Sequence, residues 1–286
     1  MKIKEVFEKK KTVLSFEIFP PKHDTTLSDI DETLAILSEL KPDYISVTFG
    51  AGGSLNNNKT IELAKKIKHE YGIEPLVHLT CLCYSKSDID NYVSLLNENG
   101  LENVLALRGD RNPAVPEKDD FIYASELVSY VKNNSNLCVA GACYPECHPE
   151  SKDRADDIGN LKKKVEAGAD FLISQLFFDN VNYFSFLEIC RIAGIGVPIM
   201  PGIMPAINKA QIERMTGLCG ATLPERFIKI LNRYSDNKQA LFDAGMSYAV
   251  SQIIDLLASG VEGIHIYTMN NPTVAKRICG EIKNLI

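Results

Sequence analysis

The chain has 286 residues, 45% of them hydrophobic, and a formal net charge of −6 at pH 7, so it can bury a full core, and one domain over residues 1–286 is the simplest organisation. The acidic balance and the short basic runs argue against a nucleic-acid-binding protein. No stretch approaches the roughly 18 apolar residues of a membrane span, and residues 1–12 lack the apolar segment of a secretion signal, so we expect a cytoplasmic protein.

The first predicted strand is the apolar, β-prone stretch Leu14-Ser15-Phe16-Glu17-Ile18-Phe19. Pro20-Pro21 ends it, because proline cannot donate to a strand ladder. Glu17 therefore lies near the carboxyl end of a strand that we predict to be buried on both faces, where a carboxylate needs a partner or a purpose. Two interpretations remain open: an ion pair with a distant Lys or Arg, or a proton donor whose charged form is disfavoured by burial.

Strand-like and helix-like stretches then alternate along the whole chain. Further strands are predicted at 43–49, 75–80, 103–107, 137–143, 170–174, 197–200 and 263–268. Helices are predicted at 27–40, 59–71, 87–99, 123–133, 152–167, 183–193 and 272–286, and within 208–218, 224–234 and 236–259.

Eight strands with helical crossovers predict an α/β protein, a closed (β/α)8 TIM barrel with extra helices before the last strand. An open doubly wound sheet is the alternative. Against it, no strand is followed by G-x-G-x-x-G, and Gly50-Ala51-Gly52-Gly53 has the wrong spacing for that fingerprint.

The eight cysteines do not suggest a metal site. Cys81-x-Cys83 and Cys143-x-x-x-Cys147-His148 lack the C-x-x-C pairing of structural zinc sites. We expect reduced thiols and no metal.

Polar residues recur where the predicted strands end, which is where barrel enzymes keep their chemistry. Each residue also has an ordinary structural interpretation: His78 as a hydrogen-bonded core histidine, Arg108 and Asp110 as partners in a tight turn, Lys164 as an exposed helix lysine. Together they favour a site that faces one large ligand set. The strand-end residues are Glu17, Thr48, His78, Thr80, Arg108, Asp110, Tyr144, Gln175, Tyr267 and Thr268.

Seven stretches, in order along nearly the whole chain, resemble the methylenetetrahydrofolate reductase family in its bacterial single-domain form. They are SFEIFPPK (15–22), YISVTFGAGGS (44–54), HLTC (78–81), LALRGD (105–110), YPECHPE (144–150), KVEAGADFLISQLFFD (164–179) and PGIMP (201–205).

The resemblance implies an FAD enzyme that reduces methylenetetrahydrofolate, with FMN as a less favoured cofactor. Glu17 would be the general acid. From its negative charge and its position close to the flavin ring, we infer that Asp110 would disfavour the anionic reduced flavin. The folate would meet Glu17, Asp110, Gln175 and Gln211. FAD would be held by Thr48, Phe49, Ala51, His78, Arg108, Gly109, Asp110, Ala124, Tyr144, His148, Asp157, Asn160 and Lys164.

The implied reaction passes hydride from a nicotinamide to the flavin and then to the folate, whose ring must first be opened by protonation. NADH, NADPH and a partner electron-donor protein all remain open as donors, and the family suggests a homo-oligomer. One departure concerns Asn271, which stands where the family commonly has an Arg that helps bind the folate tail. The competing class is a non-redox folate-binding or accessory protein on the same barrel.

Overall fold

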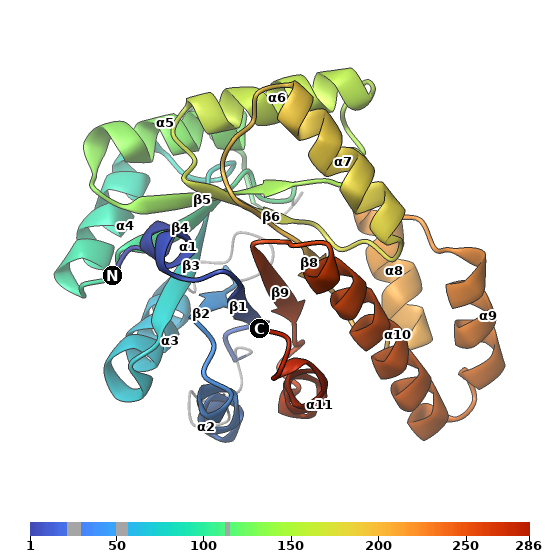
Figure 1. Cartoon of the computed structure of the whole chain (residues 1–286). Coiled ribbons are helices and arrows are strands. Elements are labelled where there is room, and N and C mark those ends of the chain that lie inside the picture. The colour runs from blue at the N-terminus through green and yellow to red at the C-terminus, as the bar shows by residue number, and fades with distance from the viewer. Residues whose placement is uncertain (22–29, 50–56, 112–114) are drawn as a thin grey trace.

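The computed structural model describes residues 1–21, 30–49, 57–111 and 115–286 (Figure 1). The strands are β1 (Val13–Ile18), β2 (Tyr44–Val47), β3 (Glu74–Thr80), β4 (Asn103–Leu107), β5 (Cys138–Cys143), β6 (Phe171–Ser174), β7 (Ile199–Met200), β8 (Gly202–Ile203) and β9 (Gly263–Tyr267). The helices are α1 (Lys4–Lys9), α2 (Asp31–Glu39), α3 (Asn57–Tyr71), α4 (Lys86–Glu98), α5 (Ala124–Asn134), α6 (Arg154–Glu166), α7 (Asn180–Ile192), α8 (Lys209–Cys219), α9 (Glu225–Tyr234), α10 (Lys238–Ala258) and α11 (Pro272–Ile282).

The described strands form one parallel sheet that curves into a nearly closed barrel. Their order is β7-β6-β5-β4-β3-β2-β1-β9-β8, and each pairing is parallel. Helices surround the outside of the sheet (Figure 1). The predicted TIM-like α/β barrel is therefore confirmed.

The seventh barrel strand is split, which the sequence analysis did not predict. Pro201 separates β7, which pairs with β6, from β8, which pairs with β9. Proline has no N–H to donate, but its carbonyl accepts from the His265 backbone at 3.0 Å. The next residue, Gly202, donates its N–H to Ser174 Oγ at 2.9 Å. The single predicted strand at 197–200 is thus two short segments that join the two sides of the barrel.

The interior of the barrel at the amino ends of the strands is apolar and is closed by α1. Asn103 anchors this helix, because its Oδ1 accepts from the Ile3 backbone N–H at 2.7 Å. The side chains that pack together here include Ile3, Val6, Val13, Tyr44, Leu76, Leu105, Phe171 and Met200.

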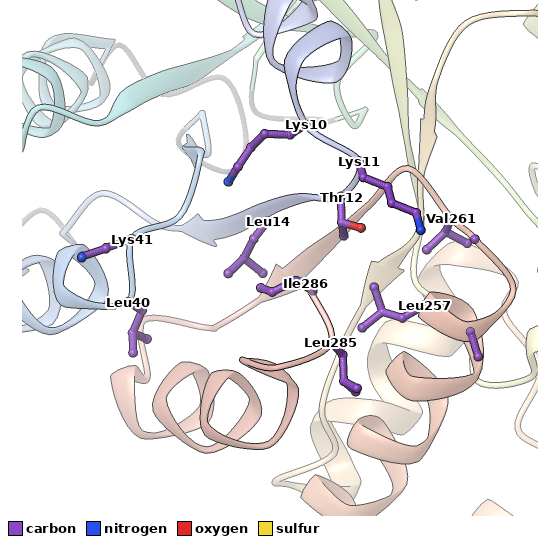
Figure 2. Close-up of a pocket in the computed structure, with 12 residues that line it drawn as sticks. Lys10, Lys11, Thr12, Leu14, Leu40, Lys41, Leu257, Val261, Leu285 and Ile286 are labelled. Carbon is purple, nitrogen blue, oxygen red and sulfur yellow. The ribbon is translucent and has the colours of Figure 1, made fainter.

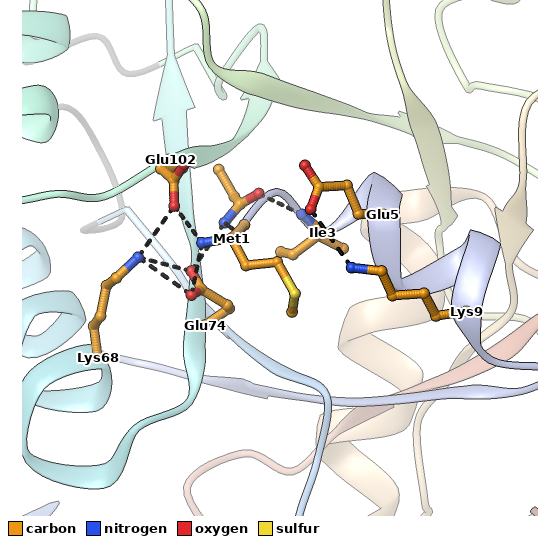
Figure 3. Close-up of polar contacts among 8 residues, drawn as sticks. Met1, Ile3, Glu5, Lys9, Lys68, Glu74 and Glu102 are labelled. Carbon is orange, nitrogen blue, oxygen red and sulfur yellow. Dashed lines mark hydrogen bonds and ion pairs between the residues drawn. The ribbon is translucent and has the colours of Figure 1, made fainter.

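Charged groups tie together the same end of the barrel on its outer edge (Figure 3). Lys68 of α3 contacts Glu74 of β3 at 3.0 Å and Glu102 before β4 at 3.4 Å. The Met1 ammonium also contacts Glu74, at 2.9 Å. These contacts join the N-terminus, α3, β3 and the segment before β4, away from the carboxyl ends of the strands.

Helices α8, α9 and α10 are the extra helices expected before the last strand. They bury a small core of their own, in which Phe227, Leu231 and Leu241 pack with Phe178 and Met204. Helix α10 approaches the backbone after β8 so closely that a Cβ at Gly245 would lie 1.9 Å from the Ala206 carbonyl oxygen. Only glycine fits there.

Several helix ends follow local capping rules. Ser85 is the N-cap of α4 and forms a capping box with Asp88. Asp153 caps α6 and Asp179 caps α7, each with a side chain that accepts one backbone N–H of the first turn, without a capping box. Among the described residues, none of the helices is both long and apolar enough to cross a membrane.

Candidate active site

Glu17 lies inside the barrel between two histidines from different strands. Its Oε2 is 3.5 Å from His78 Nε2 and 3.6 Å from His265 Nε2, and its side chain is only 12% exposed. In the described part of the chain, Glu17 forms no ion pair with a Lys or Arg. The interpretation of Glu17 as half of a structural ion pair therefore finds no support.

Strand register explains why these side chains meet. Ser15 of β1 is opposite His265 of β9, and Glu17 is opposite Ser46 of β2. Because alternate residues of a strand face the same side, Ser15 and Glu17 both point into the barrel.

A buried serine contacts each histidine. Ser15 Oγ lies 2.8 Å from His265 Nδ1, and Ser46 Oγ lies 2.6 Å from His78 Nε2. All four residues are buried. Along the barrel axis, the apolar interior at the amino ends of the strands is thus followed by a compact layer of these polar residues. Glu17 lies on the side of this layer that faces the carboxyl ends.

Burial sets the protonation of the groups around Glu17. It lowers the pKa of His78 to about 4, although the Glu17 charge acts in the opposite direction. His78 is therefore neutral near pH 7. Burial also raises the pKa of Tyr267 far above its ordinary value, and its hydroxyl donates to the Ser174 carbonyl at 2.8 Å.

The predicted cofactor residues after β2 differ in their surroundings. Thr48 is buried, and its carbonyl accepts from Thr60 Oγ1 at 3.2 Å. The Phe49 ring packs against the Tyr84 and Tyr92 rings, each 5.7 Å away between centroids. This ring is thus part of the core between sheet and helices. Ala51 lies outside the described residues.

Arg108, after β4, pairs with Glu150 of the loop after β5. Nη1 and Nη2 contact the two carboxylate oxygens at 2.5 and 2.8 Å, and this pairing lowers the pKa of Glu150 to about 2. Asp110, the alternative partner in a tight turn, is instead exposed. Gly109 has φ +90°, and a Cβ there would lie 3.1 Å from Thr80 Cβ, so glycine suits this position.

Tyr144 and His148 pack edge to face, with ring centroids 4.6 Å apart. Burial raises the pKa of Tyr144 to about 12, so the phenol stays protonated. Burial and the Arg108 charge lower the pKa of His148, whose Nδ1 accepts from the Glu150 N–H at 3.1 Å.

On α6 the three predicted FAD residues have different exposures. Asp157 is buried and accepts from Ser151 Oγ at 3.0 Å, whereas Asn160 is exposed. Lys164 turns toward the sheet, where Nζ donates to the Ala142 carbonyl at 2.6 Å, and burial lowers its pKa. It is therefore no ordinary exposed lysine.

Three further predicted residues lie at element boundaries. Ala124 is the first residue of α5, and Gln211 lies in the first turn of α8. Gln175 follows β6, and its Oε1 accepts from the Leu176 N–H at 2.8 Å.

A sequence model described as methylenetetrahydrofolate reductase matches residues 2–283. The chain belongs to the methylenetetrahydrofolate reductase family. It is 34% identical over 266 residues to 5,10-methylenetetrahydrofolate reductase of Escherichia coli, covering 93% of this chain and 89% of that protein. It is 35% identical over 301 residues to methylenetetrahydrofolate reductase (NADH) 1 of Arabidopsis thaliana, covering 99% of this chain and 50% of that protein. The chain thus spans about half the length of the plant relatives it matches.

A solved structure has the same fold. It is an uncharacterized protein from Clostridium thermocellum that binds two copies of 5-methyl-5,6,7,8-tetrahydrofolic acid, with a TM-score of 0.68, 15% identity and coverage of 100% of this chain and 99% of that one. At this identity the likeness supports the barrel alone.

Asn271, where this member of the reductase family departs from the expected Arg, has a structural role. Its side chain caps α11 by accepting from the Thr273 N–H at 3.1 Å. Its neighbour Asn270 contacts the Phe19 backbone twice, accepting from N–H at 2.7 Å and donating to the carbonyl at 2.9 Å. The end of β9 thereby fixes the segment that follows Glu17.

The sequence analysis did not single out Ser15, Ser46 or His265. The available signal was alternation: Ser15 is two residues before Glu17, and His265 is two before Tyr267. In a parallel sheet buried on both faces, polar residues inside strands stand out against the apolar pattern.

A cavity of about 420 Å³ lies at the other end of the barrel, near the start of β1 (Figure 2). Lys10, Lys11 and Lys41 surround its opening, with Leu257 and Val261 on its wall. It is remote from Glu17 and the strand-end residues. In the described ranges, no group of three or more His, Cys, Asp or Glu side chains could hold a metal ion.

Proposed function

We propose that this chain reduces 5,10-methylenetetrahydrofolate to 5-methyltetrahydrofolate with FAD and a reduced nicotinamide. The observation that carries the proposal is the environment of Glu17. Its carboxyl group is enclosed near the carboxyl ends of the barrel strands, beside two histidines and without a Lys or Arg ion-pair partner in the described chain. Family membership supports this reaction class.

Glu17 is proposed to protonate the nitrogen that departs when the five-membered folate ring opens. Ring opening needs an acid, because the departing nitrogen is a poor leaving group without a proton. The contacts to this residue come from β3 and from the end of β9. Thr268 Oγ1 donates to the Glu17 carbonyl at 2.6 Å, and His78 and His265 flank its carboxyl group.

Of the described residues proposed to hold FAD, Ala124 begins α5, and the others lie on or after the adjacent strands β2, β3, β4 and β5 or on α6, along one continuous side of the barrel opening. This side offers cations for the pyrophosphate in Arg108 and Lys164, and packed rings in Tyr144 and His148. The residues therefore fit a flavin dinucleotide, which when bound would supply the hydride-transfer chemistry. Asp110, exposed at the same opening, is proposed to face both flavin and folate.

Gln175 and Gln211 are proposed to bind the folate from the opposite side of the opening, since they follow β6 and begin α8. NADH is the donor named for the Arabidopsis relative, and we propose NADH or NADPH here. A partner electron-donor protein is an alternative source of the same electrons.

The test is anaerobic titration of purified protein reconstituted with FAD. We expect a yellow protein that bleaches with NADH or NADPH and recovers its colour with 5,10-methylenetetrahydrofolate, with one 5-methyltetrahydrofolate formed per flavin reoxidised. Bleaching with dithionite but not with a nicotinamide would point to a protein electron donor. A protein that cannot retain flavin yet binds 5-methyltetrahydrofolate would overturn the proposal in favour of a non-redox folate-binding protein.

A further inference from the structure

We infer that Ser46 is a positioning residue that fixes the ring proton of His78 on Nδ1. The decisive contact is the 2.6 Å separation of Ser46 Oγ and His78 Nε2 on the neighbouring strands β2 and β3. Both side chains are buried.

The ring carries one proton. His78 lies inside the barrel, where burial outweighs the pull of Glu17 and holds the imidazole neutral at physiological pH. A neutral imidazole has one N–H donor and one bare acceptor nitrogen. The two tautomers therefore place opposite demands on Ser46.

The hydrogen-bond donors and acceptors of Ser46 and His78 favour one tautomer. If Nε2 carried the proton, Ser46 Oγ would accept it, and the buried serine hydroxyl would need another acceptor. The described residues provide Ser46 Oγ with no second hydrogen-bond partner. If Nε2 is bare, the serine hydroxyl donates to it and both of these atoms are satisfied, and the N–H without a partner falls on Nδ1, which is not among the enclosed unpartnered atoms of the described residues.

Glu17 does not reverse this assignment. Its Oε2 lies 3.5 Å from the same Nε2, beyond the usual 2.7–3.2 Å or so of an N–H···O bond. The shorter serine contact therefore decides the tautomer. The other histidine is held differently, because Ser15 faces its Nδ1 and leaves Nε2 of His265 buried toward Glu17.

The assignment has two consequences. Nε2 of His78 is already occupied by a donor, so it is unavailable as a base for the Glu17 proton. Nδ1 carries an N–H that has no partner among the described residues and is not one of the enclosed unpartnered atoms, so it is available to a ligand. That this ligand is the flavin rests on the proposed function, whereas the tautomer itself does not.

The test is nuclear magnetic resonance of flavin-free protein carrying ¹⁵N-labelled histidine. Long-range ¹H–¹⁵N spectra distinguish a bare ring nitrogen from a protonated one, and the His78 signals among the five histidines are identified with His78→Asn. We expect a bare Nε2 and a protonated Nδ1 in the wild-type protein. Ser46→Ala should shift the pattern toward the Nε2–H form, and Ser46→Thr, which keeps the hydroxyl, should restore the wild-type pattern.

The matched control is Ser15→Ala, which removes the equivalent hydroxyl beside His265. It should change the His265 signals and leave those of His78 in place. A protonated Nε2 in the wild-type protein, or a His78 pattern that Ser46→Ala does not move, would overturn the inference. Because these spectra need no flavin, the result is independent of whether the proposed reaction occurs.

Discussion

Arg108 and Glu150 form a bidentate ion pair, with nitrogen–oxygen distances of 2.5 and 2.8 Å, between the loops that follow β4 and β5. The pair occupies a guanidinium that we propose for FAD binding. Glu150→Gln should therefore free positive charge and tighten FAD binding, by roughly twofold to tenfold, the scale of an exposed charge contact. Fluorescence quenching of FAD on titration measures this, and the gain should shrink at high salt. Weaker FAD binding would show that Glu150 orients Arg108 correctly.

The same pair gives a pH dependence with a definite sign. The pKa of Glu150 is lowered to about 2 in the folded protein, so its contribution to stability is fully present above its ordinary value near 4.5 and is lost as pH falls through about 2. The difference in unfolding midpoint between wild type and Glu150→Gln should be constant from pH 7 to 5 and vanish in stronger acid. A difference at pH 2 as large as the difference at pH 7 would contradict this.

Glu17→Gln should separate the two half-reactions. Glutamine keeps the shape but cannot deliver a proton, so the folate step should slow by about 10²–10⁴-fold or more, whereas flavin reduction needs no acid and should survive. Stopped-flow absorbance of the flavin follows each step alone. Glu281→Gln, at an exposed position on α11, is the control and should alter neither. Equal slowing of both steps would make Glu17 a structural carboxyl group.

Lys164→Ala should weaken FAD retention while the barrel stays folded, and Lys164→Met makes the sharper test. Methionine preserves an unbranched apolar stem beside Gly141 but removes the donor. We expect FAD affinity to fall by about tenfold or more, the scale of one charge-assisted hydrogen bond. Lys162→Met, an exposed neighbour on α6, should bind FAD normally. Unchanged affinity with a lowered melting temperature would confine Lys164 to its bond with the Ala142 carbonyl.

Asn271→Arg should have two opposing effects. An added cation should tighten binding of the folate tail carboxylates by about 1 kcal/mol, and loss of the α11 cap should lower stability by about 1 kcal/mol. Asn271→Asp keeps a capping oxygen, and Asn271→Ala removes the cap without adding charge. Calorimetric folate titration and thermal melts of the three variants separate the effects. Folate affinity that is equal in Arg and Ala variants would remove this position from tail binding.

The alternation of strands and helices made the barrel predictable, because hydrophobic periodicity is a local property of the sequence. The end of the first strand was equally predictable, since Pro20 has no N–H to continue the hydrogen bonding between strands. The split around Pro201 was not predicted, although the same rule applies, because only the sheet shows that the two halves pair with different neighbours.

The site was predictable in its strand-end positions and less so in its contacts. Arg108 and Glu150 are 42 residues apart, so their pairing depends on which loops adjoin. His265 was missed because a single histidine within an apolar strand is commonly an ordinary core residue. The capping role of Asn271 was visible in principle, since Asn before Pro272 is a frequent helix start.

The layering of the barrel interior separates two physical tasks along one axis. Near the amino ends of the strands, Tyr44, Leu76 and Phe171 form an apolar lower layer under α1. Nearer the carboxyl ends, Ser15 and Ser46 belong to an upper layer in which buried side chains make polar contacts. Substitutions that fill or empty the lower layer should therefore act chiefly on the melting temperature, whereas those in the upper layer should also change the hydrogen bonds around Glu17. The two layers meet where the Tyr44 ring stacks on the His265 ring, with centroids 6.4 Å apart, so a change at Tyr44 reaches both of them.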